Sequence, residues 1–527
     1  MVYASLAASD ATVWTPLIQA QAQAQHFPIP NIFVFISNTK SSNKYMGRQL
    51  FHLNHFLRLC KSLGSRSEYH ILANSSPVLK GTNTNIIRNM SSTSHVPFNR
   101  LYQIISWDEN ENLENYRVGG FHPVHLGDRF KHDRYEILRK LGFGSYSTVW
   151  LSKDLLLDRY VALKINGAVK HGDEDEITKT EKLLPTEDNS PGRDCCMIPL
   201  DTFRHTGPNG IHACLVFEVM DGSLNKYSRY RPGFVKYVAQ RTLLGISYLH
   251  RNNLVHSDLH TGNVFFRLRD VNSLTKDDFE KRYPEQQKVP LERLDGSKVD
   301  DHGPQYIVLG QPCQEEDNEQ DIGEWYRDPI HCLSKPYEVD IKIGDLGSAF
   351  IATTPPQSFC TPFSLQAPEQ ALGLANIDAK IDIWTFGCMI FQLLFGYSPV
   401  SVDPISGQKS PDEEQQDIVL GLVSLLGSIP EQLLAQCPNA NTLLQNSDIS
   451  VRRENSLHSA IEEGKLASTE PGMFVDPGAA EELNKENFPI LEDFFRQMLV
   501  WRSVDRRTAQ NLLNHTWISD NQEPALL

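Results

Sequence analysis

The sequence predicts an α+β fold with a strand-rich amino-proximal part and a larger helical carboxy-proximal part. Residues 135–141 alternate as a strand does, residues 160–165 form an apolar run, and a glycine-containing loop lies between them. Residues 235–249 are amphipathic at helical spacing, and residues 380–396 are apolar on nearly every side, which is typical of a buried helix. Two further helices are expected between residues 491 and 517.

The composition is that of a globular, soluble protein with an acidic balance. The chain has 527 residues, of which 40% are hydrophobic and 22% are charged, enough for two ordinary domains or one large domain with extensions. The formal charge of −15 disfavours binding to a bare phosphate backbone and favours a basic partner. Nine cysteines without a CxxC pair indicate a reducing compartment. The apolar run 381–395 contains Asp382 and is too short to span a bilayer, so no transmembrane segment is expected.

Residues 1–115 differ from the rest of the chain and are predicted to be a disordered extension, with order beginning near Tyr116. They contain nine Lys and Arg against six Asp and Glu, so residues 116–527 have a net charge of −18. Within the extension, residues 46–67 are basic, contain no acidic residue and space their apolar residues around a helix. This pattern resembles a mitochondrial presequence if translation starts at Met46. Otherwise a cytoplasmic or nuclear location is expected.

The polar octet His256–Asn263 lies between the apolar runs 254–255 and 264–266, which suits a loop held between two buried β segments. Asp258 and Asn263 stand five residues apart within it. Phosphoryl transfer uses such a pair, because a carboxylate accepts the proton of the attacking hydroxyl and an amide oxygen holds a magnesium ion. The alternative is an Asx-turn that takes no part in catalysis.

The glycine-containing loop is predicted to bind nucleotide phosphates. Gly142 and Gly144 let backbone amides approach a phosphate without an intervening Cβ atom. Residues 147–151 read as a strand, which excludes the helix of a Rossmann fold. Lys164 lies in an apolar run and is costly to bury unless it meets an anion, so it is a candidate partner for the same phosphates. The predicted nucleotide-binding residues of the loop are Leu141, Gly142, Phe143, Gly144, Ser145, Tyr146, Ser147, Thr148 and Val149.

Lys164 needs a carboxylate to hold it in position, and the polar segment 173–184 offers Glu176 and Glu181. We favour Glu176, because apolar residues follow it at helical spacing, whereas Glu181 lies too close to Pro185 for a mid-helix position. Alternatively, Glu176 helps to cap the first turn of that helix.

Residues 213–220 read as a buried strand that runs out into an Asp-Gly turn. At the end of this strand, the backbone of Glu218 and Met220 is expected to bond an adenine edge. Phe217 is expected at the back of the same pocket.

The next candidate metal ligand is Asp345, which lies 87 positions after Asp258. Residues 267–338 between them are polar and contain Pro and acidic clusters. Because a loop of that length is improbable inside a compact domain, we predict a partly disordered insert extruded from a short β-hairpin. Residues 339–343 alternate as the returning strand should.

Together these residues resemble the eukaryotic protein kinase fold over about residues 130–520. Within that fold, the chain is similar to the SR-protein kinases, which phosphorylate serines in arginine/serine-rich splicing factors. The resemblance to this family rests on the insert after the catalytic loop and on the strings YRVGGFHPVHLGDRF (116–130), KLGFGSYSTVWLSKD (140–154), CLVFEVM (214–220) and DEEQQDIVLGLVSLLGSIPEQLL (412–434).

The resemblance implies a bilobal kinase domain over residues 116–520, with a small β-rich lobe at about 130–220 and a larger helical lobe at about 221–520. The insert occupies about 267–338. The implied activity is that of an ATP-dependent serine/threonine protein kinase that uses Mg²⁺ and acts on basic, arginine/serine-rich protein segments. A monomer with no direct nucleic-acid or membrane partner is expected.

By the same resemblance, Asp258 is the expected catalytic base. Asn263 and Asp345 are the expected magnesium ligands. Lys164 with Glu176 matches the ion pair that orients the nucleotide phosphates.

Two features of the larger lobe also match the protein kinases. Glu369 and Arg506 match a buried pair that locks this lobe, and Asp382 matches the aspartate that braces the catalytic loop. The string HSDLHTGN also resembles the loop of aminoglycoside and choline phosphotransferases, which act on small molecules. That alternative is disfavoured by the APE, DIWTFG and HTW strings, which are typical of the protein kinase lobe.

Three residues depart from the usual protein kinase pattern. Ser257 stands where an arginine is usual, so no cation is available there for an activation-loop phosphate. Leu346 replaces a phenylalanine, and His260 replaces the lysine of the catalytic loop. We expect His260 either to act in that lysine's place when protonated or merely to pack under the loop. A pseudokinase scaffold is a third alternative, although every metal and phosphate position is filled.

Overall fold

The computed structural model divides into two compact units, Met1–Phe98 and Asn99–Leu527, each described here by itself. The described residues are 2–5, 32–36, 69–73, 101–103, 110–168, 176–183, 189–190, 192–226, 230, 232–267, 272, 285–309, 340–400, 410–437, 457–467 and 488–519. Within these residues, no helix is both long and apolar enough to cross a bilayer.

The first unit contains a three-stranded parallel sheet that the sequence did not predict. Its strands are β1 (Val2–Ser5), β2 (Ile32–Ile36) and β3 (Tyr69–Ala73), in that order across the sheet. The rest of this unit, including the basic segment 46–67, lies outside the described residues. The disorder of this part of the chain and the presence of a mitochondrial presequence therefore stay predictions.

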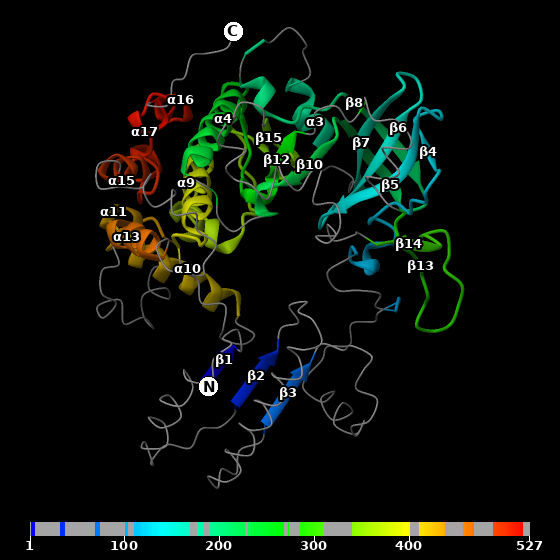
Figure 1. The fold of residues 1–527 in the computed structure, drawn as a ribbon, viewed down its shortest axis with the longest axis horizontal. Helices are drawn as coiled ribbons and strands as arrows, with labels where there is room; N and C mark the ends of the chain where they lie inside the picture. Colours follow the sequence, from blue (N-terminus) through cyan, green and yellow to red (C-terminus); the bar gives the residue numbers. More distant parts are fainter. Residues whose placement is uncertain are drawn as a thin grey trace, which may run out of the picture. The chain divides into compact units, whose positions relative to one another are not determined.

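The small lobe of the second unit is built on a six-stranded antiparallel sheet in the order β4-β5-β6-β7-β9-β8 (Figure 1). Alternate residues of β5, such as Tyr135 and Ile137, face a core that also contains Trp150 and Leu163. The predicted strand at 135–141 is confirmed and extends to Phe143. The elements of this lobe are β4 (Arg129–Phe130), β5 (Tyr135–Phe143), β6 (Ser147–Asp154), β7 (Arg159–Ala168), β8 (Asp201–Gly207), β9 (Gly210–Phe217) and α3 (Glu176–Thr180).

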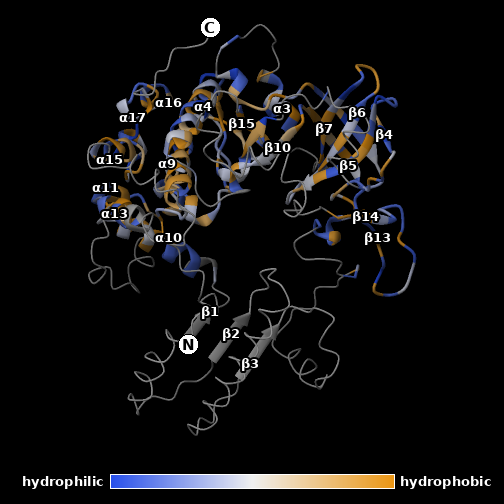
Figure 2. Cartoon of the chain, viewed as in Figure 1, coloured by the Kyte–Doolittle hydropathy of each residue, from blue (hydrophilic) through white to orange (hydrophobic). Residues whose placement is uncertain are grey.

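The large lobe is helical and is organised around α9. Every residue from Ile381 to Phe391 is buried, as the apolar sequence predicts, and Figure 2 shows apolar residues along this helix. Gly396 ends α9 with a φ of 83°, a conformation that favours glycine. The helices are α4 (Pro232–Arg251), α8 (Pro368–Ala371), α9 (Lys380–Phe395), α10 (Pro411–Leu426), α11 (Glu431–Leu434), α13 (Leu457–Ala467), α15 (Phe488–Arg496), α16 (Ala509–Leu512) and α17 (Thr516–Ser519).

The prediction of two helices between residues 491 and 517 is wrong. The structure has three, α15, α16 and α17, and the first begins at Phe488. The chain leaves helical conformation between α15 and α16 and forms a 3₁₀ turn at Ser503–Asp505. This irregular segment brings Arg506 into the core, where it is 2% exposed.

The insert begins and ends in a short antiparallel stem. β12 (Val264–Arg267) pairs with β15 (Ile341–Ile343), as the predicted hairpin requires, and β10 (Met220–Ser223) pairs with β12. Inside the insert, β13 (Lys288–Pro290) and β14 (Tyr306–Val308) form a second hairpin.

This second hairpin packs on the small lobe. Val308 belongs to the core cluster of the small-lobe sheet, and the Tyr306 hydroxyl accepts a hydrogen bond from the backbone of Leu126 at 3.0 Å. The expectation of an extruded insert is therefore wrong for this hairpin, because Val308 is buried in the core of the sheet and Leu291 and Ile307 are buried in a second apolar cluster.

Order in the second unit begins before Tyr116. Tyr102 and Leu113 are buried in a cluster with Tyr116 and Phe121, together with Ile307 from the insert. The predicted boundary at residue 116 is too late, because the preceding residues bury apolar surface against the insert hairpin.

Three histidines lie in contact in the small lobe. The ring of His122 lies 4.7 Å from that of His205 and 5.0 Å from that of His212, measured between centroids. Burial is the largest cause that lowers the pKa of His122, to about 3. The charges of His212 and then His205 lower it further, and Asp128 opposes the shift. The pKa values of His205 and His212 are also lowered, chiefly by burial.

We expect the small lobe to lose stability as the pH falls below about 6.5, the ordinary pKa of histidine. The unfolded chain then binds protons that the folded chain cannot accept, so His122 alone should cost about 3 kcal/mol at pH 4. Urea unfolding of the wild type and of His122→Phe, measured between pH 7 and pH 4, checks this. Identical pH dependence in the two proteins would contradict it.

Candidate active site

The predicted catalytic loop lies between two strands. It follows β11 (Leu254–Val255), which pairs with β16 (Phe350–Ile351), and it ends in a 3₁₀ turn, Thr261–Asn263, at the start of β12. Asp382 of α9 accepts hydrogen bonds from the backbone N–H groups of His256 and Ser257, both at 2.8 Å. The buried carboxylate therefore holds the start of the loop, as the resemblance to the protein kinases implies.

Asp258 lies in this loop with a side chain that is 17% exposed. Its buried Oδ1 has no hydrogen-bond partner among the described residues and lies 3.9 Å from Nε2 of His260. Burial raises the pKa of Asp258 to about 6, with Asp345 raising it further and His256 and Asn263 opposing the shift. A carboxylate with this pKa is ionised at neutral pH and can accept a proton.

Asn263 is oriented by the loop itself. Its side-chain amide donates to the backbone oxygen of Asp258 at 2.8 Å. That bond uses the nitrogen and leaves the amide oxygen for a hard cation.

Lys164 lies in a network of three charges. Its Nζ is 2.8 Å from Oε2 of Glu176 and 2.6 Å from Oδ1 of Asp345. Burial alone would lower the pKa of Lys164, but the two carboxylates raise it above its ordinary value. Lys164 in turn lowers the pKa of Asp345 to about 2.

The alternatives for the partner of Lys164 are now resolved. Glu176 is 4% exposed and is the first residue of α3, and it contacts Lys164. Glu181 is exposed in the following 3₁₀ turn. Glu176 therefore starts the helix, as the capping alternative supposed, but its side chain also makes the predicted ion pair.

The glycine-containing loop joins β5 to β6 and closes with a hydrogen bond from the N–H of Gly144 to the oxygen of Ser147 at 2.8 Å. Within the predicted set, Ser147 and Thr148 are buried, and Tyr146 is 73% exposed. A Cβ atom at Gly142 would meet no neighbour within 4 Å, and one at Gly144 would meet only the Ser147 hydroxyl at 3.8 Å. Packing within the protein does not require these glycines, which is consistent with close approach by a ligand.

Phe217 and Glu218 connect the two lobes. Phe217 is 7% exposed at the end of β9, and Met220 begins β10. The side chain of Glu218 pairs with Arg267 at 3.0 Å and with Lys342. Sequence reasoning missed these partners, although a basic residue in each short strand of the insert stem was a visible signal.

The comparisons with known proteins decide the family. The family sequence model described as the protein kinase domain matches residues 135–280 and 332–518. The chain belongs to the protein kinase family.

Relatives of this kinase include SR-protein kinases. It is 26% identical over 488 residues to protein kinase dsk1 of Schizosaccharomyces pombe, covering 79% of this chain and 86% of that protein. It is 28% identical over 425 residues to serine/threonine-protein kinase SRPK of Physarum polycephalum, covering 78% and 92%. SRSF protein kinase 3 of Homo sapiens is 36% identical over 174 residues, covering 31% and 30%. The predicted bilobal kinase fold and the resemblance to SR-protein kinases are confirmed.

The activation segment of the kinase is held by neutral hydrogen bonds at Ser257. The Ser257 hydroxyl donates to the backbone oxygen of Ser348 at 2.8 Å, and the Thr361 hydroxyl donates to the backbone oxygen of Ser257 at 2.6 Å. Leu346, at the start of this segment, is 3% exposed in a small apolar cluster, so the core accepts it in place of phenylalanine.

We therefore expect kinase activity without activation-loop phosphorylation. Protein made in bacteria and treated with phosphatase should keep its activity within about twofold, because Ser257 needs no phosphate partner. Mass spectrometry before and after treatment, with an initial-rate assay, checks this. Loss of activity that a partner kinase restores would show that the segment needs a phosphate after all.

His260 is held by the loop as a neutral imidazole. Its Nδ1 accepts a hydrogen bond from the N–H of Gly262 at 3.0 Å, so the ring proton lies on Nε2, which faces Asp258. Burial and then the neighbouring His256 lower the pKa of His260, opposed by Asp345. A lowered pKa disfavours the protonated form that the lysine-like role of His260 would require.

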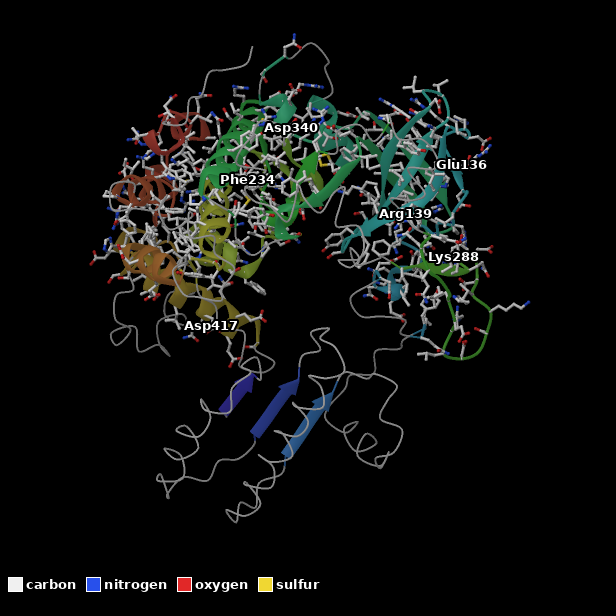
Figure 3. The ribbon with its side chains drawn as sticks, in the orientation of Figure 1. Glu136, Arg139, Phe234, Lys288, Asp340 and Asp417 are labelled. Carbon is white, nitrogen blue, oxygen red and sulfur yellow. The ribbon has the colours of Figure 1, made fainter. Side chains whose placement is uncertain are left out.

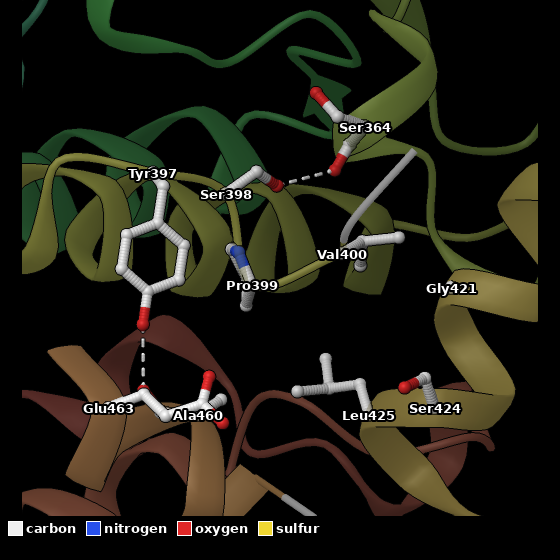
Figure 4. Close-up of a pocket in the computed structure, with 10 residues that line it drawn as sticks. All are labelled: Ser364, Tyr397, Ser398, Pro399, Val400, Gly421, Ser424, Leu425, Ala460 and Glu463. Atoms are coloured by element: carbon white, nitrogen blue, oxygen red, sulfur yellow. Dashed lines mark hydrogen bonds between the residues drawn. The ribbon is translucent and has the colours of Figure 1, made fainter. Parts of the chain in front are cut away.

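A pocket of about 420 Å³ lies in the large lobe between the loop after α9, α10 and α13 (Figure 4). Two hydrogen bonds join residues of its lining, from the Tyr397 hydroxyl to the oxygen of Ala460 at 2.9 Å and from the Ser398 hydroxyl to the oxygen of Ser364 at 3.0 Å. It is lined by Ser364, Tyr397, Ser398, Pro399, Val400, Gly421, Ser424, Leu425, Ala460 and Glu463. None of the predicted catalytic residues lines it, so it is separate from the phosphate site.

Proposed function

We propose that this serine/threonine protein kinase transfers the γ-phosphoryl group of ATP to serines in basic, arginine/serine-rich segments. The observation that supports this best is the carboxylate of Asp258, whose pKa of about 6 leaves it mostly ionised at neutral pH and whose Oδ1 has no hydrogen-bond partner among the described residues. It lies in the loop that also contains Asn263, while Lys164, Glu176 and Asp345 form the adjoining charge network.

The residues present fit a magnesium–nucleotide complex. The amide oxygen of Asn263 and the carboxylate of Asp345 are hard oxygen donors, and Mg²⁺ commonly takes one or two such protein ligands together with phosphates and water. Bound magnesium would offset the charge of the phosphates. The loop amides near Gly142 and Gly144 would hold the phosphates, and Lys164 would orient them from the position that Glu176 gives it.

Asp258 then acts on the acceptor. Its carboxylate orients the serine hydroxyl toward the γ-phosphorus and takes the hydroxyl proton as the serine oxygen bonds to phosphorus and the bond from phosphorus to ADP breaks. His260 would offer its Nε2 proton beside the same carboxylate, as a neutral donor.

The net negative charge of the chain supports a basic substrate. Residues 116–527 have a net charge of −18, which attracts arginine-rich segments over roughly the Debye length of about 8 Å at physiological ionic strength. The human relative SRSF protein kinase 3 carries a substrate class in its name. The acidic field would attract cationic aminoalcohols as well, so it is the likeness to this relative that favours arginine/serine segments over small aminoalcohols.

We expect an arginine/serine-repeat peptide to be phosphorylated on serine, with kcat/KM falling by about tenfold between low and high salt. A peptide with the arginines replaced by glutamates, and choline and an aminoglycoside as small-molecule acceptors, provide the comparison at equal ATP. Faster phosphorylation of the acidic peptide, or a rate for the basic peptide that salt does not change, would exclude the basic-substrate proposal. Turnover of the small molecules alone would favour the phosphotransferase alternative.

A further inference from the structure

The insert of the large lobe supports the strand that leads into the glycine-containing loop. β4 pairs only with the first two residues of β5, Tyr135 and Glu136. Further along β5, the side chain of Gln286 bonds the backbone of Lys140 twice. The Lys140 N–H donates to Oε1 at 2.8 Å, and Nε2 donates to the Lys140 oxygen at 3.0 Å. One buried side chain thus replaces a missing neighbouring strand.

The side chain of Lys140 is held from two other segments. It is 2% exposed, pairs with the buried Glu111 and donates to the backbone oxygen of Val308 in the insert at 3.2 Å. The Tyr116 hydroxyl donates to the same glutamate. The residues before the sheet and the insert therefore meet at one position of β5.

This position adjoins the predicted phosphate-binding loop. Lys140 directly precedes Leu141 and Gly142, and its Nζ lies 5.5 Å from the ring centroid of Phe143. Figure 3 labels Arg139 in the middle of β5 and Lys288 in the insert strand β13. The loop itself is largely exposed and makes few bonds to the rest of the lobe, so its position depends on where β5 ends.

We propose that Gln286, with the Glu111–Lys140 pair, is a positioning residue for the nucleotide phosphates, so that the insert sets the affinity for ATP. This rests on the proposed use of ATP by the kinase. Gln286 acts through the backbone of Lys140 and touches no reacting atom. Its loss should free the end of β5 and misplace the loop amides, while Asp258 stays in place.

The full-length Gln286→Ala protein tests the inference. The variant loses the two hydrogen bonds to Lys140 and a longer one to the backbone oxygen of Leu309. The loss at Lys140 should raise the KM for ATP and its dissociation constant by about tenfold, with kcat changed by less than about twofold. Affinity for adenosine should stay unchanged, because adenosine has no phosphates for the loop to hold. The matched control is Gln287→Ala, since Gln287 is exposed and bonds the hairpin through its backbone oxygen to the N–H of Leu309.

The outcomes separate this inference from the proposed function. A wild-type protein that binds no ATP would contradict the proposed function itself. An active wild type with Gln286→Ala equal to Gln287→Ala would overturn the positioning role. Equal losses of adenosine and ATP affinity in Gln286→Ala would also overturn it, since they would indicate general damage to the small lobe. Selective loss of ATP affinity in Gln286→Ala alone supports it.

Discussion

The Asp258→Asn protein should transfer phosphate at least about a hundredfold more slowly than the wild type while binding ATP equally well. The substitution keeps the shape of the side chain but removes the group that accepts the proton. Oδ1 of Asp258 is buried and has no hydrogen-bond partner among the described residues, so no neighbouring group stands in for it. Single-turnover rates on a serine peptide measure the loss of transfer, and a separate ATP-binding titration measures the unchanged affinity for ATP.

The pH dependence gives an independent measurement. Because the pKa of Asp258 is raised to about 6, the base is ionised above that pH and becomes protonated as the pH falls through it. The wild-type rate should therefore drop by about tenfold between its plateau and pH 5. The Asp258→Asn variant should not show this fall of the rate at acidic pH, the acidic limb of the profile.

The matched control is Asp158→Asn, because Asp158 has a 91% exposed side chain on a small-lobe turn. It should behave as the wild type. A residual rate in Asp258→Asn within tenfold of the wild type, or an unchanged acidic limb, would remove the assignment of the base.

The Glu369→Leu protein should lose about 3–5 kcal/mol of unfolding free energy. Glu369 makes two 2.6 Å bonds to the guanidinium of Arg506, whose side chain is fully buried. Removing the carboxylate leaves a buried cation without a counter-charge, held by the backbone oxygens of Lys380, Val500 and Trp501 and by the ring of Trp384. Urea unfolding of the large lobe, followed by tryptophan fluorescence, measures the loss.

A double variant distinguishes an unpaired charge from lost packing. Glu369→Leu combined with Arg506→Met should recover much of the stability, because no charge then remains buried. The exposed pair of Arg502 and Asp505 is the matched control, and Asp505→Leu should leave the unfolding midpoint almost unchanged. If the double variant is no more stable than the single one, the cost does not come from the unpaired guanidinium.

Features that depend on short stretches of chain could be predicted from the sequence. The catalytic loop lies within eight residues between two apolar runs, and it folds between β11 and β12 as expected. α9 is apolar on nearly all sides and is buried on nearly all sides. Glu176 could be preferred over Glu181 from helical spacing alone. In each case, periodicity along the chain already reports which residues are buried.

Polar partners from distant segments were decided only by the tertiary structure. Lys164 and Asp345 are 181 positions apart and still form a 2.6 Å ion pair. Gln286 stands in a polar insert that the sequence predicts to project away from the domain, yet it is 6% exposed and bonds Lys140 from 146 positions away. A polar residue in a polar segment has no periodicity that reports burial. Its partner is set by which backbone groups the folded sheet leaves unpaired, and that is a property of the assembled lobe rather than of any one stretch of sequence.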